Sequence, residues 1–182
     1  MNRDPITPMS ALSSRVFATV LAAGLALGVP ASLGAQGAAP KFTNLIENDM
    51  SRCAPGAGPA VRVDVTGMKS ADGLLIVRAY HAREGEWLKA KKYFAKVHEP
   101  ARKGRMSVCV PVPAAGENYA VAVQHDVKGN YATNFSTDGA GMSNNPVVKS
   151  FIGIPRPPAV DKVAFPVGSG VTRIAIEMRY RG

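Results

Sequence analysis

Two polar stretches of the chain carry the residue types best suited to binding or catalysis. The first closes a run of apolar residues, and the second follows a short distance further along the chain. Together they supply six candidate ligand-binding residues: His125, Asp126, Asn130, Ser143, Asn144 and Asn145. Imidazole, carboxylate, hydroxyl and amide groups can all bind a polar ligand. The alternative role for residues 143–145 is to hydrogen-bond the backbone of their own loop, as short polar side chains often do.

These residues match no familiar catalytic motif. His125 and Asp126 are neighbours, so a strand would point their side chains to opposite faces. Ser143 is followed by two amides, whereas the serine of a nucleophile elbow is followed after one residue by glycine. We therefore expect a protein that is not an enzyme and that needs no cofactor. A hydrolase-like enzyme in which His125, Asp126 and Ser143 converge is the third alternative considered below.

The first 35 residues have the layout of a secretory signal peptide. Arg3 and Arg15 precede an uncharged, mostly apolar run from Val16 to Val29, and small residues lead up to Ala35. The competing interpretation, a transmembrane anchor, needs about 20 apolar residues, and this run is shorter. We therefore expect cleavage near Ala35, a periplasmic or secreted protein, and no transmembrane anchor after cleavage.

Positive charge is concentrated in residues 83–105, although the whole chain has a formal net charge of +9. Seven residues form this candidate basic patch: Lys89, Lys91, Lys92, Lys96, Arg102, Lys103 and Arg105. In an exported protein such a patch favours an anionic envelope partner, such as lipid head groups, lipopolysaccharide or acidic polysaccharide, over nucleic acid. The alternative is a solvated sheet edge whose lysines prevent strand pairing.

Cys53 and Cys109 are the only cysteines, and in an oxidising compartment such a pair indicates a disulfide. A redox or metal-binding pair is the alternative, which the absence of C-x-x-C spacing disfavours. In the run 105–112 the valines share one parity and Cys109 has the other, so a strand would turn Cys109 away from the core. The bridge would then pin residues around Cys53 to the outside of the sheet, and its reduction would loosen residues 36–58 more than the core.

The remainder of the chain predicts an all-β domain at residues 60–182, preceded by an arm at 36–59 that includes a helix-compatible piece at 42–50. Alternating or apolar runs predict about seven short strands, at 60–66, 74–81, 93–98, 105–112, 118–126, 162–167 and 171–180. Residues 127–160 are polar and rich in glycine and proline, which indicates a long loop. This pattern favours an antiparallel sandwich of the immunoglobulin-like or prealbumin (transthyretin)-like type, with a small barrel as the alternative.

Several of these stretches resemble the DUF2141 family of exported bacterial proteins. The strand Tyr119-Ala-Val-Ala-Val-Gln-His-Asp126 is followed by Gly129-Asn130 and then by Gly141-Met-Ser-Asn-Asn-Pro146. The Gly153-Ile-Pro155 region, the Val163-Ala-Phe165 strand and the final strand follow in the same order. The resemblance covers about residues 60–180 and implies an immunoglobulin-like or prealbumin-like sandwich, but the family's function is unknown.

The resemblance also suggests a calcium loop after Asp126, because family members tend to have acidic and amide residues there. The four candidate metal ligands in this chain are Asp126, Asn130, Asn134 and Asp138. Lys128 and Asn134 stand where the family often has Asn and Asp, which replaces oxygen ligands with a cation and an amide. We therefore favour Asx turns, in which Asp126 and Asn130 bond the loop backbone, over calcium binding.

These observations predict an exported, non-enzymatic domain that binds or scaffolds in the bacterial cell envelope. The loop at 126–156 would be its functional edge, and the basic segment at 83–105 would assist. A ligand-binding or calcium-binding module that uses the loop after Asp126 is the alternative.

Overall fold

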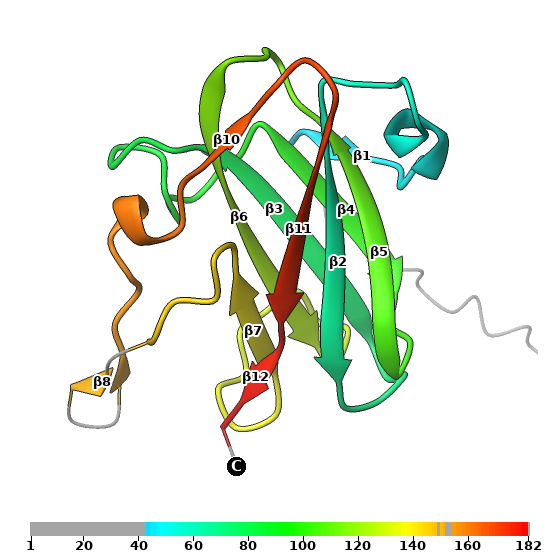
Figure 1. The fold of residues 1–182 in the computed structure, drawn as a ribbon. Helices are drawn as coiled ribbons and strands as arrows, with labels where there is room; N and C mark the ends of the chain where they lie inside the picture. The colour runs from blue at the N-terminus through cyan, green and yellow to red at the C-terminus, as the bar shows by residue number, and fades with distance from the viewer. Residues whose placement is uncertain (1–42, 149, 152–153, 182) are drawn as a thin grey trace, which may run out of the picture. The chain divides into compact units, whose positions relative to one another are not determined.

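The structure is a computed structural model that describes residues 43–148, 150–151 and 154–181 (Figure 1). The predicted signal peptide at 1–35 and the beginning of the predicted arm lie outside these residues. The described strands are β1 (Leu45–Ile46), β2 (Ala60–Met68), β3 (Leu74–His81), β4 (Ala95–Pro100), β5 (Gly104–Pro111), β6 (Glu117–Asp126), β7 (Gly139–Met142), β8 (Ser150–Phe151), β9 (Ile154–Pro155), β10 (Phe165–Val167), β11 (Val171–Glu177) and β12 (Arg179–Tyr180). Two short 3-10 helices accompany them, η1 (Met50–Cys53) and η2 (Val160–Lys162).

The strands form two main sheets, which confirms the all-β prediction. The large sheet has the order β1-β4-β3-β6-β7-β12, and β10 also pairs with β6. The small sheet has the order β11-β2-β5, and β8 and β9 form a separate hairpin. β6 pairs with β3, β7 and β10, so it brings together strands that are far apart in the sequence.

The sheets are mixed, and the prediction of a purely antiparallel architecture is wrong. β11 runs parallel to β2 over seven residue pairs, from Val171 opposite Ala60 to Glu177 opposite Thr66 (Figure 1). β1 also runs parallel to β4. A half-buried strand shows the same alternation of apolar and polar residues in either direction, so the sequence pattern alone could not distinguish the two.

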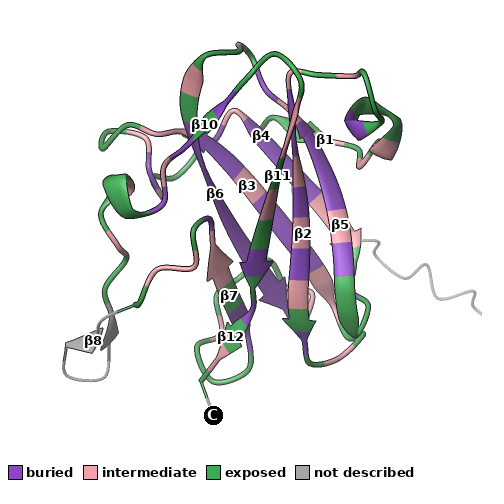
Figure 2. Ribbon diagram, viewed as in Figure 1, coloured by how far each residue is buried: buried purple, intermediate pink, exposed green. Residues whose placement is uncertain are grey.

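One hydrophobic core is shared by both sheets. The valines of β2 and β5 contribute Val61, Val63, Val65, Val108 and Val110, and the large sheet contributes Leu75, Val77, Val97, Tyr119, Val121 and Val123. Buried valines alternate with less buried polar residues along the middle of β2, and β5 buries its valines and Cys109, whereas almost all of β6 is buried (Figure 2). Both faces of β6 are therefore covered, one by the core and the other by loops.

The outer face of the large sheet has a smaller cluster of its own. The segment 82–94, which links β3 to β4, places Trp87 and Tyr93 against Tyr80 of β3, with edge-on ring contacts at centroid distances of 5.4 and 6.2 Å. The Trp87 indole N–H donates to the Pro158 carbonyl at 3.0 Å. The segment around Trp87 is thus one of the covers on this face.

The described part of the arm is not helical at residues 45–46, so that part of the helix-compatible prediction is wrong. Residues 45–46 pair with β4, and a 3-10 turn begins only at Met50. The predicted disulfide is confirmed between Cys53 and Cys109, with their Cα atoms 5.8 Å apart. Cys109 packs with Cys53 and Ala60 in a cluster separate from the core, as the parity of β5 predicted.

Candidate functional site

His125 is fully buried in a hydrogen-bonded network that ties the end of β6 to the C-terminal strand. Its Nε2 donates to the Asp72 carbonyl at 2.8 Å, because a carbonyl can only accept. Nδ1 forms a second hydrogen bond with the Tyr180 hydroxyl at 2.6 Å. The Lys69 amide donates to the same hydroxyl at 3.1 Å. His125 therefore positions β12 and offers no ring nitrogen to a ligand.

The loop between β6 and β7 is organised by two buried carboxylates. The Asp126 carboxylate accepts the amide of Tyr131 at 2.6 Å and that of Asn130 at 3.3 Å. The Asp138 carboxylate accepts the amide of Asn134 at 2.9 Å and three further donors, from Gln124, Val127 and Thr137. The Asn130 side-chain oxygen accepts the Ala132 amide and the Asn134 side-chain amide, both at 3.1 Å.

These contacts bear directly on the candidate calcium ligands. The carboxylate oxygens of Asp126 and Asp138 and the amide oxygen of Asn130 all accept hydrogen bonds from the loop itself. Within the described residues, no three His, Cys, Asp or Glu side chains lie close enough together to hold a metal ion. This geometry is that of a self-bonded loop rather than of the six to eight oxygens that calcium requires.

The second polar stretch fastens the segment after β7 to both sheets. Ser143 is fully buried, where its hydroxyl donates to the Val163 carbonyl at 2.6 Å and accepts the Val121 amide at 3.1 Å. The Asn144 amide donates to the Ala164 carbonyl at 2.9 Å. Ser143 and Asn144 thus connect β6 to the chain just before β10, which is the loop-fastening role considered above.

Asn145 and Asn48 cap the two edges of the small sheet in the same way. At β11, Asn145 donates from Nδ2 to the Ala175 carbonyl at 2.9 Å and accepts the Glu177 amide at 2.8 Å. At β5, Asn48 donates to the Ser107 carbonyl at 3.2 Å and accepts the Cys109 amide at 2.9 Å. Each side-chain amide makes the pair of hydrogen bonds that a neighbouring strand would make. Each therefore satisfies a backbone carbonyl and a backbone amide that would otherwise be open to pairing with another strand.

These caps belong to two segments that cross from one sheet to the other. We call residues 44–53 the first seam, because they pair with β4 and then cap β5. We call residues 143–146 the second seam, because they bond the β6 and β10 region and then cap β11. The disulfide lies at the end of the first seam, and the second seam is held by hydrogen bonds alone.

The structure divides the candidate basic patch into two groups. Lys89, Lys91 and Lys92 are exposed before β4 begins, and Arg102, Lys103 and Arg105 are exposed after it ends. At about 3.3 Å per residue, the six residues of β4 separate the groups by roughly 20 Å. Lys96 belongs to neither, because it is only 4% exposed on the outer face of β4.

Lys96 lies in a cationic row on that face. It is the register partner of Arg78 on β3, and His98 lies two residues further along β4. Burial, together with the Arg78 charge, lowers the pKa of the Lys96 ammonium to about 8. Burial and the charges of Lys96 and Arg78 lower the pKa of His98 to about 4, against a smaller opposing effect of Asp126. Each shift reflects burial first and the neighbouring positive charges second.

Beside this row, a groove of about 650 Å³ opens over β3, β6 and β7. Its floor includes Arg78, Ala122 and Met142, which the sheet register aligns across the three strands. Leu88 lines it from the segment before β4, and Phe135 lines it from the loop after β6. The second seam continues into the wall through Val147 and Val148.

The groove is mostly apolar, and its apolar side chains are unusually exposed. Phe135, Val147 and Val148 are 58%, 79% and 38% exposed. Its size lies within the range of about 300–1,000 Å³ that is typical of small-molecule sites. An apolar hollow with a few placed polar groups is the usual form of a binding site.

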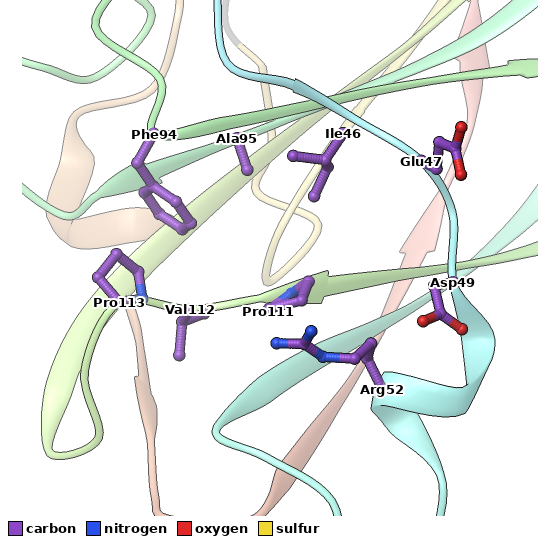
Figure 3. A pocket seen from close by; sticks show the side chains of 9 residues that line it. All are labelled: Ile46, Glu47, Asp49, Arg52, Phe94, Ala95, Pro111, Val112 and Pro113. Carbon is purple, nitrogen blue, oxygen red and sulfur yellow. The ribbon is translucent and has the colours of Figure 1, made fainter.

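A second hollow, of about 450 Å³, lies at the first seam (Figure 3). Ile46, Phe94 and Val112 line it, and all three pack against the main core. Figure 3 shows the Arg52 side chain reaching toward Pro111 at the mouth, with Glu47 and Asp49 to one side. This cleft is therefore an opening onto the core with charges of both signs around it.

Sequence reasoning placed the site along one loop and missed most of the groove. Of its candidate ligand-binding residues, only Asn145 lines the groove, together with the candidate metal ligand Asp138. Arg78, Leu88 and Phe135 were not singled out, because each belongs to a different segment. The available signal was Arg78 itself, a cation at a central position of an otherwise apolar strand.

A model of one protein family matches the chain. The family is described as "Uncharacterized protein conserved in bacteria (DUF2141)", and the match covers residues 63–175. No curated protein and no solved structure matches the chain significantly. In the part of the chain that the structure describes, no helix is long and apolar enough to cross a membrane.

Proposed function

The chain belongs to the DUF2141 family, and we propose that it is a non-enzymatic binding domain of the bacterial cell envelope that uses the groove over β3, β6 and β7. The observation that carries the proposal is an open, mostly apolar groove with a cation in its floor. The candidate residues that first suggested catalysis hold the fold together instead. His125 and Ser143 are fully buried. Both ring nitrogens of His125 are hydrogen-bonded, to Tyr180 and Asp72. The Ser143 hydroxyl is hydrogen-bonded to Val121 and Val163.

The proposal includes the compartment and the type of fold. The signal-peptide pattern supports a periplasmic or secreted protein, and the buried disulfide fits an oxidising compartment. Two sheets that share one core support a sandwich related to the immunoglobulin-like or prealbumin-like type, with one parallel edge strand in each sheet. The exposed cations at both ends of β4 would assist in attracting an anionic envelope component.

Calcium binding by the loop after Asp126 is not part of the proposal. The contacts of Asp126 and Asp138 support a structural role, in which the carboxylates replace the backbone acceptors that a long loop lacks. The same loop presents Phe135 to the groove, so its contribution to binding would be the placement of an apolar wall.

Filling the groove tests this proposal. Ala140 is exposed on β7 and lines the groove, so Ala140→Phe would occupy its space while leaving the sheet register intact. Ala175→Phe is the matched control, because Ala175 is an exposed alanine of an edge strand outside the groove. The probes are vesicles of phosphatidylglycerol and phosphatidylethanolamine, purified lipopolysaccharide, and alginate as an acidic polysaccharide.

We expect the wild-type protein and Ala175→Phe to bind at least one of these probes, and Ala140→Phe to bind it at least tenfold more weakly. Vesicle flotation and calorimetric titration measure the affinities. The proposal fails if the wild type binds none of the three probes, or if Ala140→Phe binds as tightly as the control.

A further inference from the structure

Resting on the proposed function, we infer that the groove takes a single-chain anionic amphiphile, whose head group pairs with Arg78 and whose aliphatic chain lies against Phe135, Val147 and Val148. This inference names the class of ligand, and it commits the groove to an amphiphile rather than to a polysaccharide. Three features of the groove lead to it: the free hydrogen-bonding capacity of Arg78, the balance of charge, and the place of the apolar side chains.

Most N–H donors of the Arg78 guanidinium have no hydrogen-bond acceptor among the described residues. Among the described residues its guanidinium makes one hydrogen bond, from Nη2 to Gln124 Oε1 at 3.2 Å, and no ion pair. A guanidinium carries five N–H donors in a fixed fork that matches the two oxygens of a carboxylate or the oxygens of a phosphate. Gln124 is itself held by the Ala132 carbonyl and by Asp138, so the hydrogen bond fixes the position of Arg78.

The charges around Arg78 favour an anion over a cation. Lys96 lies directly beside it on β4, so the two cations stand side by side on this face and would both attract an anion. Asp138 and Glu177 also line the groove. The four hydrogen bonds that Asp138 accepts disperse its negative charge into the loop, and Glu177 is exposed to solvent.

The other arginine contacts of the groove hold its wall. Arg179 donates to the Pro146 carbonyl at 3.2 Å and to the Asn145 carbonyl at 3.5 Å, at the start of the segment that carries Val147 and Val148. Arg181 also lines the groove, but like Arg179 it belongs to the C-terminal segment, whereas Arg78 is the lining cation on a central strand of the sheet. An aliphatic chain leaving Arg78 would meet Ala122 and Met142 on the floor and the exposed side chains of Phe135, Val147 and Val148 beyond.

The chain contains a built-in reporter for such a ligand. Trp87 is the only tryptophan, and its neighbour Leu88 lines the groove. The indole N–H is bonded to the Pro158 carbonyl, next to Pro157 in the groove wall. Occupation of the groove should therefore change the fluorescence of Trp87 without any added label.

The experiment titrates the full chain with dodecanoate below its micellar concentration and follows Trp87 fluorescence. Acetate, dodecyl maltoside and dodecyltrimethylammonium supply the head group alone, a neutral head group and a cationic one. We expect a saturable change with dodecanoate and at least tenfold weaker binding of the other three. Arg78→Met should weaken dodecanoate binding at least tenfold, because a charge-assisted hydrogen bond is worth roughly 1.5–3 kcal/mol.

Two further variants separate the head group from the chain. Arg78→Lys should recover part of the lost affinity, and Phe135→Ser should weaken dodecanoate binding about tenfold while leaving the selectivity for the anion unchanged. Phe135 is an exposed loop residue, so this variant is expected to fold normally. Arg102→Met, which removes an exposed cation outside the groove, should bind dodecanoate like the wild type.

Three results would overturn the inference: no saturable change with dodecanoate, equal binding of dodecyltrimethylammonium, or unchanged binding in both Arg78→Met and Phe135→Ser. If dodecanoate fails but Ala140→Phe still abolishes binding of an envelope probe, the groove binds another class of ligand and the proposed function stands. If neither dodecanoate nor any envelope probe binds, both fail.

Discussion

The two seams cover opposite edges of the small sheet, each with one asparagine side chain. They differ in their covalent links and in the hollows that lie beside them. Each places an asparagine amide on an edge strand, Asn48 on β5 and Asn145 on β11. The first seam adds a disulfide, and the cleft beside it opens onto the main core. The second seam has no covalent link, and the groove beside it is lined by exposed apolar side chains outside that core. From this comparison we propose that the first seam serves stability alone, whereas the second seam also borders the binding site.

The disulfide gives the largest expected effect. With Cys53→Ala and Cys109→Ala together, we expect amide exchange in residues 44–53 to accelerate about 100-fold, the equivalent of about 3 kcal/mol of local stability. Exchange at residues 143–146 should change little, because those residues have no connection to the bridge. Hydrogen–deuterium exchange with mass spectrometry measures both segments in one experiment.

The matched measurement on β3 and β6 decides whether the effect is local. Their exchange rates should rise far less than those of the first seam, since the bridge lies outside the main core. A uniform rise across all strands would contradict the account and would mean that the disulfide sets the stability of the whole domain.

The buried hydroxyl of the second seam gives the next effect. Ser143→Ala removes a donor to the Val163 carbonyl and an acceptor for the Val121 amide, both in the interior. We expect the free energy of unfolding to fall by about 2–3 kcal/mol, because buried backbone groups would lose their partners. Urea denaturation measures this loss.

Ser107→Ala is the control for that substitution. Ser107 lies on β5 beneath the first seam, and its hydroxyl bonds the half-exposed Asp64 carboxylate at 2.6 Å. Its loss should cost less than about 1 kcal/mol, because water can replace the bond. Equal losses for the two serines would show that the second seam is no more dependent on its hydrogen bonds than the first.

The smallest effect concerns pH and the cationic row beside the groove. Burial and the Lys96 and Arg78 charges hold the pKa of His98 at about 4 in the folded protein, against 6.5 in the unfolded chain. The unfolded chain therefore takes up this proton first, and the stability is lost as the pH falls from about 6.5 to 4. Relative to His98→Phe, the wild type should lose about 1–2 kcal/mol over this window, less than the full pKa difference implies, because His98 is partly exposed and solvent screens the charges.

Chemical denaturation of both proteins at several pH values measures this difference. The comparison with the variant removes the contribution of carboxylates, which titrate in the same range in both proteins. A constant difference between the two proteins from pH 6.5 to 4 would contradict the lowered pKa of His98 in the folded protein.

Much of the fold followed from local sequence patterns. The valine alternation of β2 and β5 and the bounds of β3 at 74–81 were predictable because the residues that decide burial are neighbours in the chain. The disulfide followed from having two cysteines and one connectivity. β7 was missed because Gly139-Ala-Gly-Met has no apolar alternation. A side chain at Gly141 would lie 2.5 Å from Ile176, so glycine marks close packing there.

The candidate site was less predictable for a physical reason. The motif 143–146 indicated a cluster of polar side chains. Whether a polar side chain binds a ligand or a backbone group depends on what lies within hydrogen-bonding distance in the folded protein. Ser143 donates a hydrogen bond to the Val163 carbonyl, twenty residues away in the sequence, and Asn145 donates one to the Ala175 carbonyl, thirty residues away. The groove needs Arg78, Leu88 and Phe135 at once, and only the pairing of β3 and β6 together with the two flanking loops brings them together.

The most direct test of the central claim is a map of where an anionic amphiphile binds. Amide chemical shifts of the isotope-labelled protein, recorded by NMR with increasing dodecanoate, report on the groove and the cleft at once. The account predicts saturable shifts at Arg78, Ala122 and Phe135 and in residues 140–148, with little change at Ile46, Phe94 and Val112. Shifts that cluster around the cleft of the first seam, or that remain absent from the groove at saturating dodecanoate, would contradict it.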